Sequence, residues 1–377
     1  MRILFVITNS TLCDGISRHI LTLVEGFSDN IQIGLCVTHK PGELTERASQ
    51  MGVRVFSLHC PHGHDPRILP RFKSVLDQFQ PDLIHAHVLP FFSGLLLLTV
   101  GRNIPLIATQ HVICDPKPLK GRLKDLLLRK YGDFVYGHVR RHIMISGPIQ
   151  ESYNQRYPNR KTPQVVCYNA VCTNSMPVKD RDWLLAELGL PKSAILIGMV
   201  GRMAEIKDWP AFIEICDLLG ENDSYHFIAV GDGPLLDGLR KHELVMKSPG
   251  HFHWLGYRSD GKRIIGALDV FLLTSVWEGM PGVVLESFAM RTVVAGFVPG
   301  GGVEEILAFE KEMGGRLAAL NHERDCRQAA NDVLHLIGDL ATREAMTQRA
   351  YSVVETHFDS KVICKQLERM YFEVLSE

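Results

Sequence analysis

Along the whole chain, short apolar runs alternate with segments of helical periodicity, and this alternation restricts the fold more than any other feature. In the N-terminal half, the predicted strands are Ile3–Ile7, Ile31–Val37, Leu83–His87 and Leu106–Thr109. The predicted helices that follow them are Ser17–Glu25, Glu43–Met51, Phe91–Gly101 and Leu119–Lys130. Such alternation is typical of βαβ units, in which parallel strands form one sheet with helices on its faces.

The same plan restarts after a stretch rich in Pro and Asn at about 169–192. The predicted strands of this half are Ala194–Val200, His226–Val230, Phe252–Leu255 and Val270–Leu273, and its predicted helices are Trp209–Leu219, Pro234–Lys247 and Pro281–Met290. We therefore predict an α/β protein with two doubly wound, Rossmann-like domains, 1–175 and 176–355, that face each other across a cleft. Ligands of such sheets bind at the carboxyl ends of the strands.

The last segment, 356–377, contains a predicted amphipathic helix over Asp359–Leu375. Its apolar residues recur at helical spacing at Val362, Ile363, Leu367, Met370, Tyr371 and Val374. We expect this helix to cross back and pack on the N-terminal domain. A helix that completes the second domain would satisfy the same pattern.

Composition excludes several classes of protein. A chain of 377 residues, 46% of them hydrophobic, is long enough to bury two cores. Its net charge of -1 argues against a strongly basic nucleic-acid-binding protein. The nine cysteines include no Cys-x-x-Cys pair and are typical of reduced thiols in a cytoplasmic protein.

Two apolar stretches bear on membranes and export. The apolar run at Ile3–Ile7 is too short for a signal peptide and suits a strand. The longest apolar run, Val88–Val100, is interrupted by Pro90 and Gly94 and is shorter than the roughly 18 residues of a membrane span. We expect a cytoplasmic protein.

Two loops that follow predicted strands carry groups suited to a diphosphate. Thr8–Gly15 is a polar turn with a glycine before a helix, where free backbone N–H groups can receive a phosphate. After Ala194–Val200, Arg202 supplies a planar guanidinium and Lys207 a point charge. Taken alone, each loop is also compatible with an ordinary turn or a solvated charged loop.

A third segment, Ser275–Glu286, contains two glutamates with seven residues between them, around a Gly-Met-Pro-Gly turn. This spacing places Glu278 at a strand end and Glu286 about two turns into a helix. A carboxylate can accept two hydrogen bonds from a ribose diol. The N–H groups of Gly282–Val284, at the start of the helix, can face an anion.

Histidines also lie at strand ends. His111 follows Leu106–Thr109, and His85 and His87 end the strand before it. The pairs of closely spaced histidines are His62/His64, His85/His87 and His251/His253. They suggest a zinc site, but no third ligand stands at a suitable spacing and there is no His-Glu-x-x-His helix, so we expect no metal.

Taken together, the order of these motifs resembles that of the retaining GT-B glycosyltransferases of family 4 (group 1), over essentially the whole chain. The matching segments are Asp-x-Ile-His-Ala-His at 82–87, Thr-x-His at 109–111, Gly-Arg…Lys-Asp at 201–208, Gly-Asp-Gly-Pro at 231–234, Trp-Leu-Gly-Tyr-Arg at 254–258, Asp-Val-Phe-Leu-Leu-Thr-Ser at 269–275, Glu-x7-Glu at 278–286 and Gly-Gly-Val-x-Glu-Ile at 301–306. The Glu-x7-Glu element together with the Arg/Lys pair is the specific part.

The resemblance implies that the C-terminal domain binds a nucleotide-diphosphate sugar, with a UDP-sugar favoured and GDP-mannose second. The N-terminal domain would bind a glycan or lipid-linked acceptor, and the sugar would be transferred with retention of anomeric configuration. No metal or other cofactor would be required, since no Asp-x-Asp stands at a strand end to hold one. Closure of the two domains would complete the site.

The resemblance also implies roles for single residues. Arg202 and Lys207 would neutralise the leaving diphosphate, helped by the helix starts at Gly15 and Val283–Val284. The donor sugar would be held by Glu278 and by the backbone of Met280, Pro281 and Gly282.

In the same interpretation, Glu286 would hold the donor ribose. His111 would bond the sugar from the other domain and help to orient the reacting carbon. The expected catalytic residues are His111, Glu278, Arg202 and Lys207.

Two other functions fit the same fold. One is a sugar-nucleotide 2-epimerase, which would consume donor without an acceptor. The other is a non-catalytic sugar-nucleotide-binding protein on a dead transferase fold.

The balanced net charge conceals an asymmetry. Residues 1–172 contain 20 Lys+Arg and 12 Asp+Glu, a net charge of +8, and residues 173–377 contain 21 and 30, a net charge of -9. Six basic residues crowd around leucines at 117–130. This segment is either a core-packed helix with solvated charges or a basic amphipathic helix that makes peripheral contact with the anionic inner face of a membrane.

Overall fold

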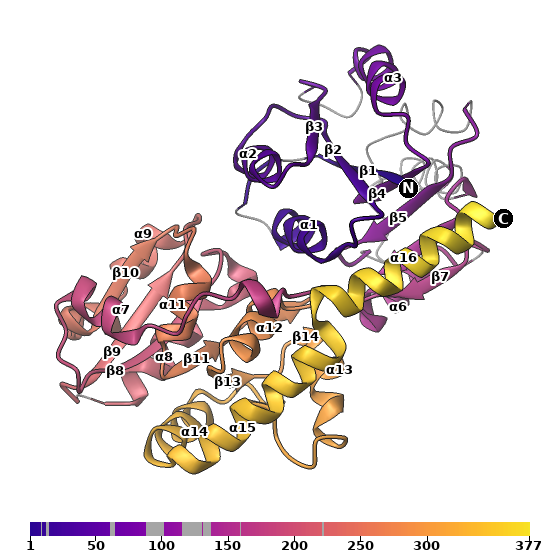
Figure 1. Ribbon diagram of the computed structural model, residues 1–377. Helices are drawn as coiled ribbons and strands as arrows, with labels where there is room; N and C mark the ends of the chain where they lie inside the picture. The colour runs from indigo at the N-terminus through magenta and orange to yellow at the C-terminus, as the bar shows by residue number, and fades with distance from the viewer. Residues whose placement is uncertain are drawn as a thin grey trace. The chain divides into compact units, whose positions relative to one another are not determined.

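The computed structural model describes residues 1–8, 10–12, 15–60, 65–87, 102–114, 130, 137–158, 160–220 and 222–377. The chain forms two units (Figure 1): Met1–Ala170 with Ser360–Glu377, and Val171–Asp359. The two crossings between the units are adjacent in space. Val171 pairs with Asp359 in a parallel bridge, and its N–H donates to the carbonyl of Phe358 at 2.9 Å. The second unit is therefore a continuous insertion into the first.

Seven parallel strands form the sheet of the first unit, in the order β3-β2-β1-β4-β5-β6-β7. These strands are β1 (Arg2–Ile7), β2 (Gln32–Val37), β3 (Arg54–Ser57), β4 (Leu83–His87), β5 (Leu106–Gln110), β6 (Arg141–Met144) and β7 (Gln164–Val166). The described helices between them are α1 (Gly15–Gly26), α2 (Glu43–Gln50), α3 (Ile68–Phe79) and α6 (Gly147–Arg156). Strand β1 lies inside the sheet and is buried from Ile3 to Ile7, which explains its unbroken apolar sequence.

The second unit has six parallel strands in the order β10-β9-β8-β11-β13-β15. These strands are β8 (Ile195–Val200), β9 (Tyr225–Val230), β10 (Phe252–Gly256), β11 (Val270–Leu273), β13 (Val293–Phe297) and β15 (Ala319–Asn321). Its α-helices are α7 (Arg181–Leu188), α8 (Trp209–Leu218), α9 (Leu236–Arg240), α10 (Glu243–Lys247), α11 (Gly261–Ala267), α12 (Gly282–Ala289), α13 (Val303–Leu307), α14 (Cys326–Gly338) and α15 (Leu340–Val353). A separate two-stranded ladder pairs β12 (Trp277–Glu278) with β14 (Gly300–Gly301).

Both sheets are doubly wound, and the predicted α/β class with two Rossmann-like sheets is confirmed. In the first unit the chain builds outward from β1 to β3 and then reverses to β4 on the other side of β1. In the second unit it reverses in the same way between β8 and β11. The carboxyl edge at such a reversal is the usual ligand site of a doubly wound sheet.

The last helix, α16 (Ser360–Ser376), belongs to the first unit and follows a π-helix at Val354–Phe358. Its apolar face packs into the core that contains β1 and α1. The contact with α1 is close, because a Cβ placed on Gly26 would lie 2.8 Å from the sulfur of Cys364 and from the carbonyl of Ser360. Of the two arrangements allowed by the sequence, the structure has the one in which this helix packs on the first unit.

Several predicted boundaries differ from the structure. The helix predicted at Pro234–Lys247 is two helices, α9 and α10, because His242 has an extended backbone and its ring accepts the N–H of Leu244 at 3.3 Å. The chain leaves the first unit at Ala170 rather than 175, and returns at Ser360 rather than 356. The predicted helices at 91–101 and 119–130 lie outside the described residues, Lys130 excepted.

Candidate functional site

Lys207 and Glu278, separated by 71 residues in sequence, form an ion pair in the second unit. The Nζ of Lys207 donates to Oε1 of Glu278 at 2.5 Å, and the hydroxyl of Ser275 donates to the same oxygen at 2.6 Å. Both charged side chains are mostly buried, with 19% of Lys207 and 12% of Glu278 exposed. Both follow strands that flank the reversal of the sheet, β8 and β11, so the pair lies at the carboxyl edge.

Backbone contacts hold the two loops of this pair together. The carbonyl of Lys207 accepts the hydroxyl of Thr274 at 2.9 Å, and the carbonyl of Ile206 accepts the N–H of Val276 at 2.9 Å. Arg324 reinforces the arrangement, since its guanidinium donates to the carbonyls of Thr274 and Ser275 at 2.9 and 3.0 Å. Arg324 was not identified from the sequence, because nothing in its local motif marks it.

Arg202 lies on the same loop as Lys207 and is exposed. The indole N–H of Trp209 donates to its carbonyl at 3.0 Å, which fixes the backbone while the side chain projects outward. Its guanidinium makes no hydrogen bond or ion pair with the described residues. Asp208, with φ of 48°, caps α8 by accepting the N–H of Ala211 at 3.3 Å. The loop is thus anchored at both ends and keeps Arg202 available to a ligand.

The helix α12 begins at Gly282, with Pro281 as its N-cap, next to the strand that carries Glu278. The N–H of Val284 already donates to the carbonyl of Pro281 at 3.0 Å. The first-turn amides of α12 without such a bond are those of Gly282 and Val283, and contact of the Val284 amide with an anion stays a prediction. Met280, just before the helix, is buried.

Glu286 lies in the second turn of α12 with only 8% of the residue exposed. Its Oε1 lies 4.0 Å from the Nζ of Lys262, on α11. The sequence does not predict this contact of Lys262, since a lysine within a helix belongs to no recognisable motif. The Lys262 contact is long enough to leave the carboxylate free to accept further hydrogen bonds.

The carboxyl edge of the first sheet carries the predicted turn at 8–15, of which residues 9, 13 and 14 lie outside the described residues. Gly15 begins α1 and is exposed. A Cβ placed on Gly15 would meet no other part of the described chain within 4 Å. Ser10 ties the turn to α2, because its carbonyl accepts the N–H of Leu44 at 3.0 Å.

Four histidines gather near this edge: His19, His85, His87 and His111. His85 and His87 are two residues apart in β4 and so point to the same face of the sheet. The ring of His87 stacks between those of His85 and His111, with centroid distances of 4.4 and 5.2 Å. Nδ1 of His87 and Nε2 of His111 are hydrogen-bonded at 2.9 Å.

Burial keeps this cluster of histidines uncharged. Desolvation lowers the pKa of His19 to about 4 and that of His85 to about 3, and it holds the pKa values of His87 and His111 well below the usual range. His85 is bound on both sides, by the hydroxyl of Tyr371 at 2.7 Å and that of Thr109 at 2.6 Å. His19 and Tyr371 were not predicted as part of this cluster, since their helices are distant in sequence.

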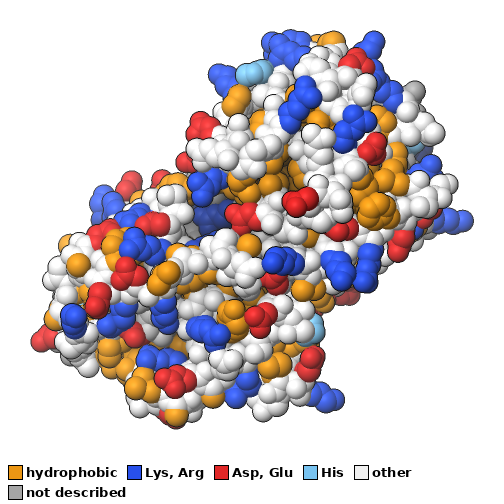
Figure 2. All heavy atoms as spheres, in the orientation of Figure 1, with side chains coloured by type: hydrophobic (Ala, Val, Ile, Leu, Met, Phe, Trp, Pro, Cys, Tyr) orange, Lys and Arg blue, Asp and Glu red, His pale blue; other side chains and the backbone are white. Residues whose placement is uncertain are grey.

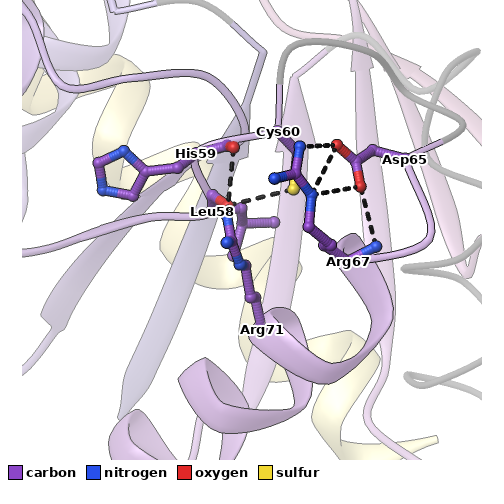
Figure 3. Close-up of polar contacts among 6 residues, drawn as sticks. All are labelled: Leu58, His59, Cys60, Asp65, Arg67 and Arg71. Atoms are coloured by element: carbon purple, nitrogen blue, oxygen red, sulfur yellow. Dashed lines mark hydrogen bonds and ion pairs between the residues drawn. The ribbon is translucent and has the colours of Figure 1, made fainter.

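The loop after β3 contains a second polar network, drawn in Figure 3. Arg71 donates to the carbonyls of Leu58 and His59 at 2.5 and 3.1 Å, and Arg67 pairs with Asp65 at 2.6 Å. The Arg67 guanidinium lowers the pKa of Asp65 to about 2. Arg71 lies on α3, so its two hydrogen bonds tie the residues that follow β3 to that helix. His62 and His64, one of the pairs considered for zinc, lie outside the described residues.

The described part of the chain has neither a metal-binding cluster nor a membrane-spanning helix. No group of three or more His, Cys, Asp and Glu side chains is arranged to hold a metal ion there. No described helix combines the length and the apolar character needed to cross a bilayer. On the face seen in Figure 2, Lys and Arg side chains are interspersed with Asp and Glu.

Comparison with known proteins identifies the family. The model of Glycosyltransferase Family 4 matches residues 13–175, and the model of Glycosyl transferases group 1 matches residues 194–339. The chain belongs to the family 4, group 1 glycosyltransferases. The two matches cover both halves of the chain, and the second includes Arg202, Lys207, Glu278 and Glu286.

Curated relatives of this glycosyltransferase are moderately similar. It is 24% identical to the putative teichuronic acid biosynthesis glycosyltransferase TuaC of Bacillus subtilis, over 77% of this chain and 70% of that protein. It is 38% identical over 105 residues to the UDP-Gal:alpha-D-GlcNAc-diphosphoundecaprenol alpha-1,3-galactosyltransferase of Escherichia coli. The second match spans 26% of this chain and only 27% of the galactosyltransferase.

Solved structures share the fold. HepE of Anabaena, crystallised with UDP and glucose, superposes with a TM-score of 0.80 at 20% identity, over 99% of this chain and 100% of that one. WaaG, a glycosyltransferase involved in lipopolysaccharide biosynthesis, superposes with a TM-score of 0.70 at 14% identity, over 98% and 99%. The GT-B fold is confirmed, and none of these comparisons supports the epimerase alternative.

Proposed function

We propose that this glycosyltransferase moves a sugar from a nucleotide-diphosphate sugar, with a UDP-sugar favoured, to a glycan or lipid-linked acceptor. We further propose that transfer retains the anomeric configuration and needs no metal. The observation that carries this proposal is the Lys207–Glu278 pair at the carboxyl edge of the second sheet, beside the start of α12. The pair combines a cation for a phosphate with a carboxylate for sugar hydroxyls.

The cations of this edge suit a diphosphate leaving group. The ammonium of Lys207 has three protons, so it can keep its bond to Glu278 and still donate to a phosphate oxygen. Arg202 adds a fork of N–H donors, and the Gly282 and Val283 amides add the positive end of a helix dipole. These groups stabilise the negative charge that grows on the diphosphate as the sugar leaves, a role that needs no metal.

The carboxylates suit the other parts of the donor. Glu286, whose nearest cation is 4.0 Å away, can accept hydrogen bonds from both hydroxyls of a ribose. Glu278 lies closer to the cations and suits the transferred sugar. Preference for UDP is supported by HepE, which was crystallised with UDP and with UDP-glucose, and by the galactosyltransferase, whose name specifies UDP-Gal.

The imidazole of His111, in the first unit, is the proposed partner of the donor sugar. It is neutral and 7% exposed, so it can exchange hydrogen bonds with a sugar without charging. Because His111 and Lys207 belong to different units, turnover requires a conformation that brings both to one donor molecule.

Contact with an anionic membrane is a further part of the proposal. A cavity of about 520 Å³ at the amino ends of β6 and β7 is lined by the basic residues Arg140, Arg141, Arg160 and Lys161, together with Gly137, Val139, Thr162, Pro163 and Glu377. Arg141 pairs with Glu377, whereas Arg140 and Lys161 are exposed and have no ion-pair partner among the described residues. The segment 117–130, apart from Lys130, lies outside them. The Escherichia coli galactosyltransferase, whose name specifies a diphosphoundecaprenol acceptor, supports contact with a lipid surface as part of the proposal.

The donor is tested by measuring binding and hydrolysis of UDP-, GDP- and ADP-sugars with and without EDTA. UDP-sugars should bind best, and EDTA should have no effect. Lys207→Ala and Glu286→Ala should each weaken nucleotide binding about tenfold or more. Normal affinity in both variants would overturn the donor site, and conversion of donor without an acceptor into a 2-epimer would identify an epimerase.

Membrane contact is tested by co-sedimentation with vesicles that contain or lack anionic lipid. The double variant Arg140→Ala/Lys161→Ala should lose binding to anionic vesicles. The matched double variant Lys40→Ala/Lys73→Ala removes two exposed charges from the same unit and should retain it. Equal partitioning of the two variants, or of the two vesicle types, would reject the contact.

A further inference from the structure

The hydrogen bond between His87 and His111 leaves one ring nitrogen of His111 for a ligand. Nε2 of His111 is engaged with Nδ1 of His87 at 2.9 Å, so Nδ1 is the nitrogen that remains. His87 is completely buried and cannot itself reach a substrate from the surface. Its effect on the reaction must therefore pass through His111.

His87 is in turn held rigidly. Its ring stacks on His85 at an interplanar angle of 26°, and the ring of Phe5 packs against it in a T-shaped arrangement with a centroid distance of 5.2 Å. His85 cannot shift because its two nitrogens bind Tyr371, on α16, and Thr109, on β5. Three elements of the first unit thus fix the nitrogen that faces His111.

The neutral state of the histidines limits the number of ring protons in this cluster. The rings that contact His111 and His87 are those of His19 from α1, His85 from β4 and Phe5 from β1, and the hydroxyls of Thr109 and Tyr371 bind His85. Since burial keeps all four histidines neutral, each ring carries a single N–H. His19 accepts the N–H of Ala170 at its Nδ1, at 3.4 Å, and so carries its proton on Nε2.

The proton of the His87–His111 bond has two possible positions. If His111 were the donor, His87 would carry its own proton on Nε2, a buried atom without a hydrogen-bond partner among the described residues. If His87 is the donor, its buried Nε2 carries no proton and is an acceptor without a hydrogen-bond partner among the described residues. An unpaired acceptor is tolerated inside proteins more often than an unpaired N–H.

We propose that His87 is a positioning residue: it donates Nδ1–H to Nε2 of His111 and thereby holds His111 as the tautomer with its proton on Nδ1. His111 then presents an N–H donor to an oxygen of the donor sugar. The inference rests on the proposed role of His111 and adds the residue that sets its proton and its orientation.

Two substitutions separate this role from a packing role. His87→Phe keeps an aromatic ring for stacking but removes the N–H, whereas His87→Asn keeps a donor at the position of Nδ1 but leaves a cavity. We expect His87→Phe to lower kcat by about 10- to 100-fold with an unchanged KM for the donor, and His87→Asn to retain more activity. Thermal stability should follow the opposite order, with His87→Phe the more stable variant.

A direct readout comes from ¹⁵N NMR of the histidine side chains in the full chain. The wild type should show His111 protonated on Nδ1, and His87→Phe should show a mixture of tautomers. The inference is overturned if His111 carries its proton on Nε2 in the wild type, or if His87→Phe is as active as the wild type. His111→Ala is the control: if it is fully active, the proposed role of His111 fails, whatever His87 does.

Discussion

The absence of a side chain at Gly301 allows the close backbone packing that positions Glu278 at the carboxyl edge of the second sheet. The φ of 107° at Gly301 is unfavourable for other residues, and an added Cβ would lie 1.9 Å from the carbonyl of Glu278. This close approach lets β14 pair with β12 and fixes the strand that presents Glu278. The position of the carboxylate therefore depends on a glycine 23 residues away in sequence.

Gly301→Ala should destabilise the second unit by at least about 1–3 kcal/mol, because the new Cβ forces both the backbone angle and the strand contact to change. Gly15→Ala is the matched control, since its Cβ meets nothing within 4 Å, and its stability should stay within about 0.5 kcal/mol of the wild type. Urea unfolding measures both. Equal midpoints for the two variants would contradict the packing seen around β14.

Glu278→Gln should lower kcat by about 100- to 1,000-fold, since it removes the negative charge beside Lys207 while keeping the shape of the side chain. Ser275→Ala removes one hydrogen bond to the same oxygen and should cost only about tenfold. Initial rates at saturating donor compare the two. A larger loss in Ser275→Ala than in Glu278→Gln would show that the hydroxyl, not the charge, matters.

The sequence predicted Lys207 and Glu278 as separate features but not their contact. Their spacing of 71 residues has no local signature, and only the parallel sheet brings the ends of β8 and β11 together. The sequence also did not show that the amide of Val284 has a hydrogen-bond partner within its own helix. Pro281 caps α12 and its carbonyl accepts that N–H, a detail of the first turn that composition does not reveal.

Among the elements, α16 links the C-terminal end of the described chain to the histidines. Tyr371 stacks on Phe27 at 5.9 Å and binds His85 through its hydroxyl. Apolar spacing was sufficient to predict this helix, because its buried stripe follows the helical period. The hydrogen bond at its centre was not predictable, since a tyrosine in such a stripe is usually only a packing residue.

Tyr371→Phe should cost about 1–2 kcal/mol of unfolding free energy, because it leaves a buried imidazole nitrogen unpaired while the ring still stacks. Phe372→Ala, on the exposed side of the same helix, should change the free energy by less than about 0.5 kcal/mol. Denaturant titrations compare them. If the order is reversed, the hydroxyl does not hold His85.

The predicted types of secondary structure are correct where the sequence has long apolar or periodic runs. They are wrong where a local polar contact ends or divides a helix. His242 splits a predicted helix because its own ring caps the next one. Short strands such as β7 and β15 were not predicted, since three residues give no periodicity. Both depend on neighbouring strands for their hydrogen bonds.

On the scale of the whole molecule, the two units carry different titratable groups. In the first unit, burial lowers the pKa values of His19, His85 and His142 to about 4, 3 and 3, besides those of His87 and His111. In the second unit, burial lowers the pKa values of His226 and His253. Acid therefore acts more strongly on the first unit.

A histidine with a depressed pKa contributes full stability above its unfolded value of about 6.5 and loses it as the pH falls towards the folded value. Each such group should cost about 1.4 kcal/mol for each pH unit in this window. We expect the first unit to unfold between about pH 6 and pH 4, before the second. All four tryptophans, Trp183, Trp209, Trp254 and Trp277, lie in the second unit, so far-UV circular dichroism should change at a higher pH than tryptophan fluorescence. Coincident transitions would contradict this order.

The adjacency of Val171 and Asp359 has a consequence for synthesis on the ribosome. All residues of the second unit leave the ribosome as one uninterrupted block, so it can fold as soon as Asp359 has emerged. The first unit begins earlier but lacks α16, which covers α1 and holds His85, until the final residues of this sequence are made. The unit whose synthesis starts first is therefore completed last. Until α16 has been made, His85 on β4 lacks its hydrogen bond to Tyr371.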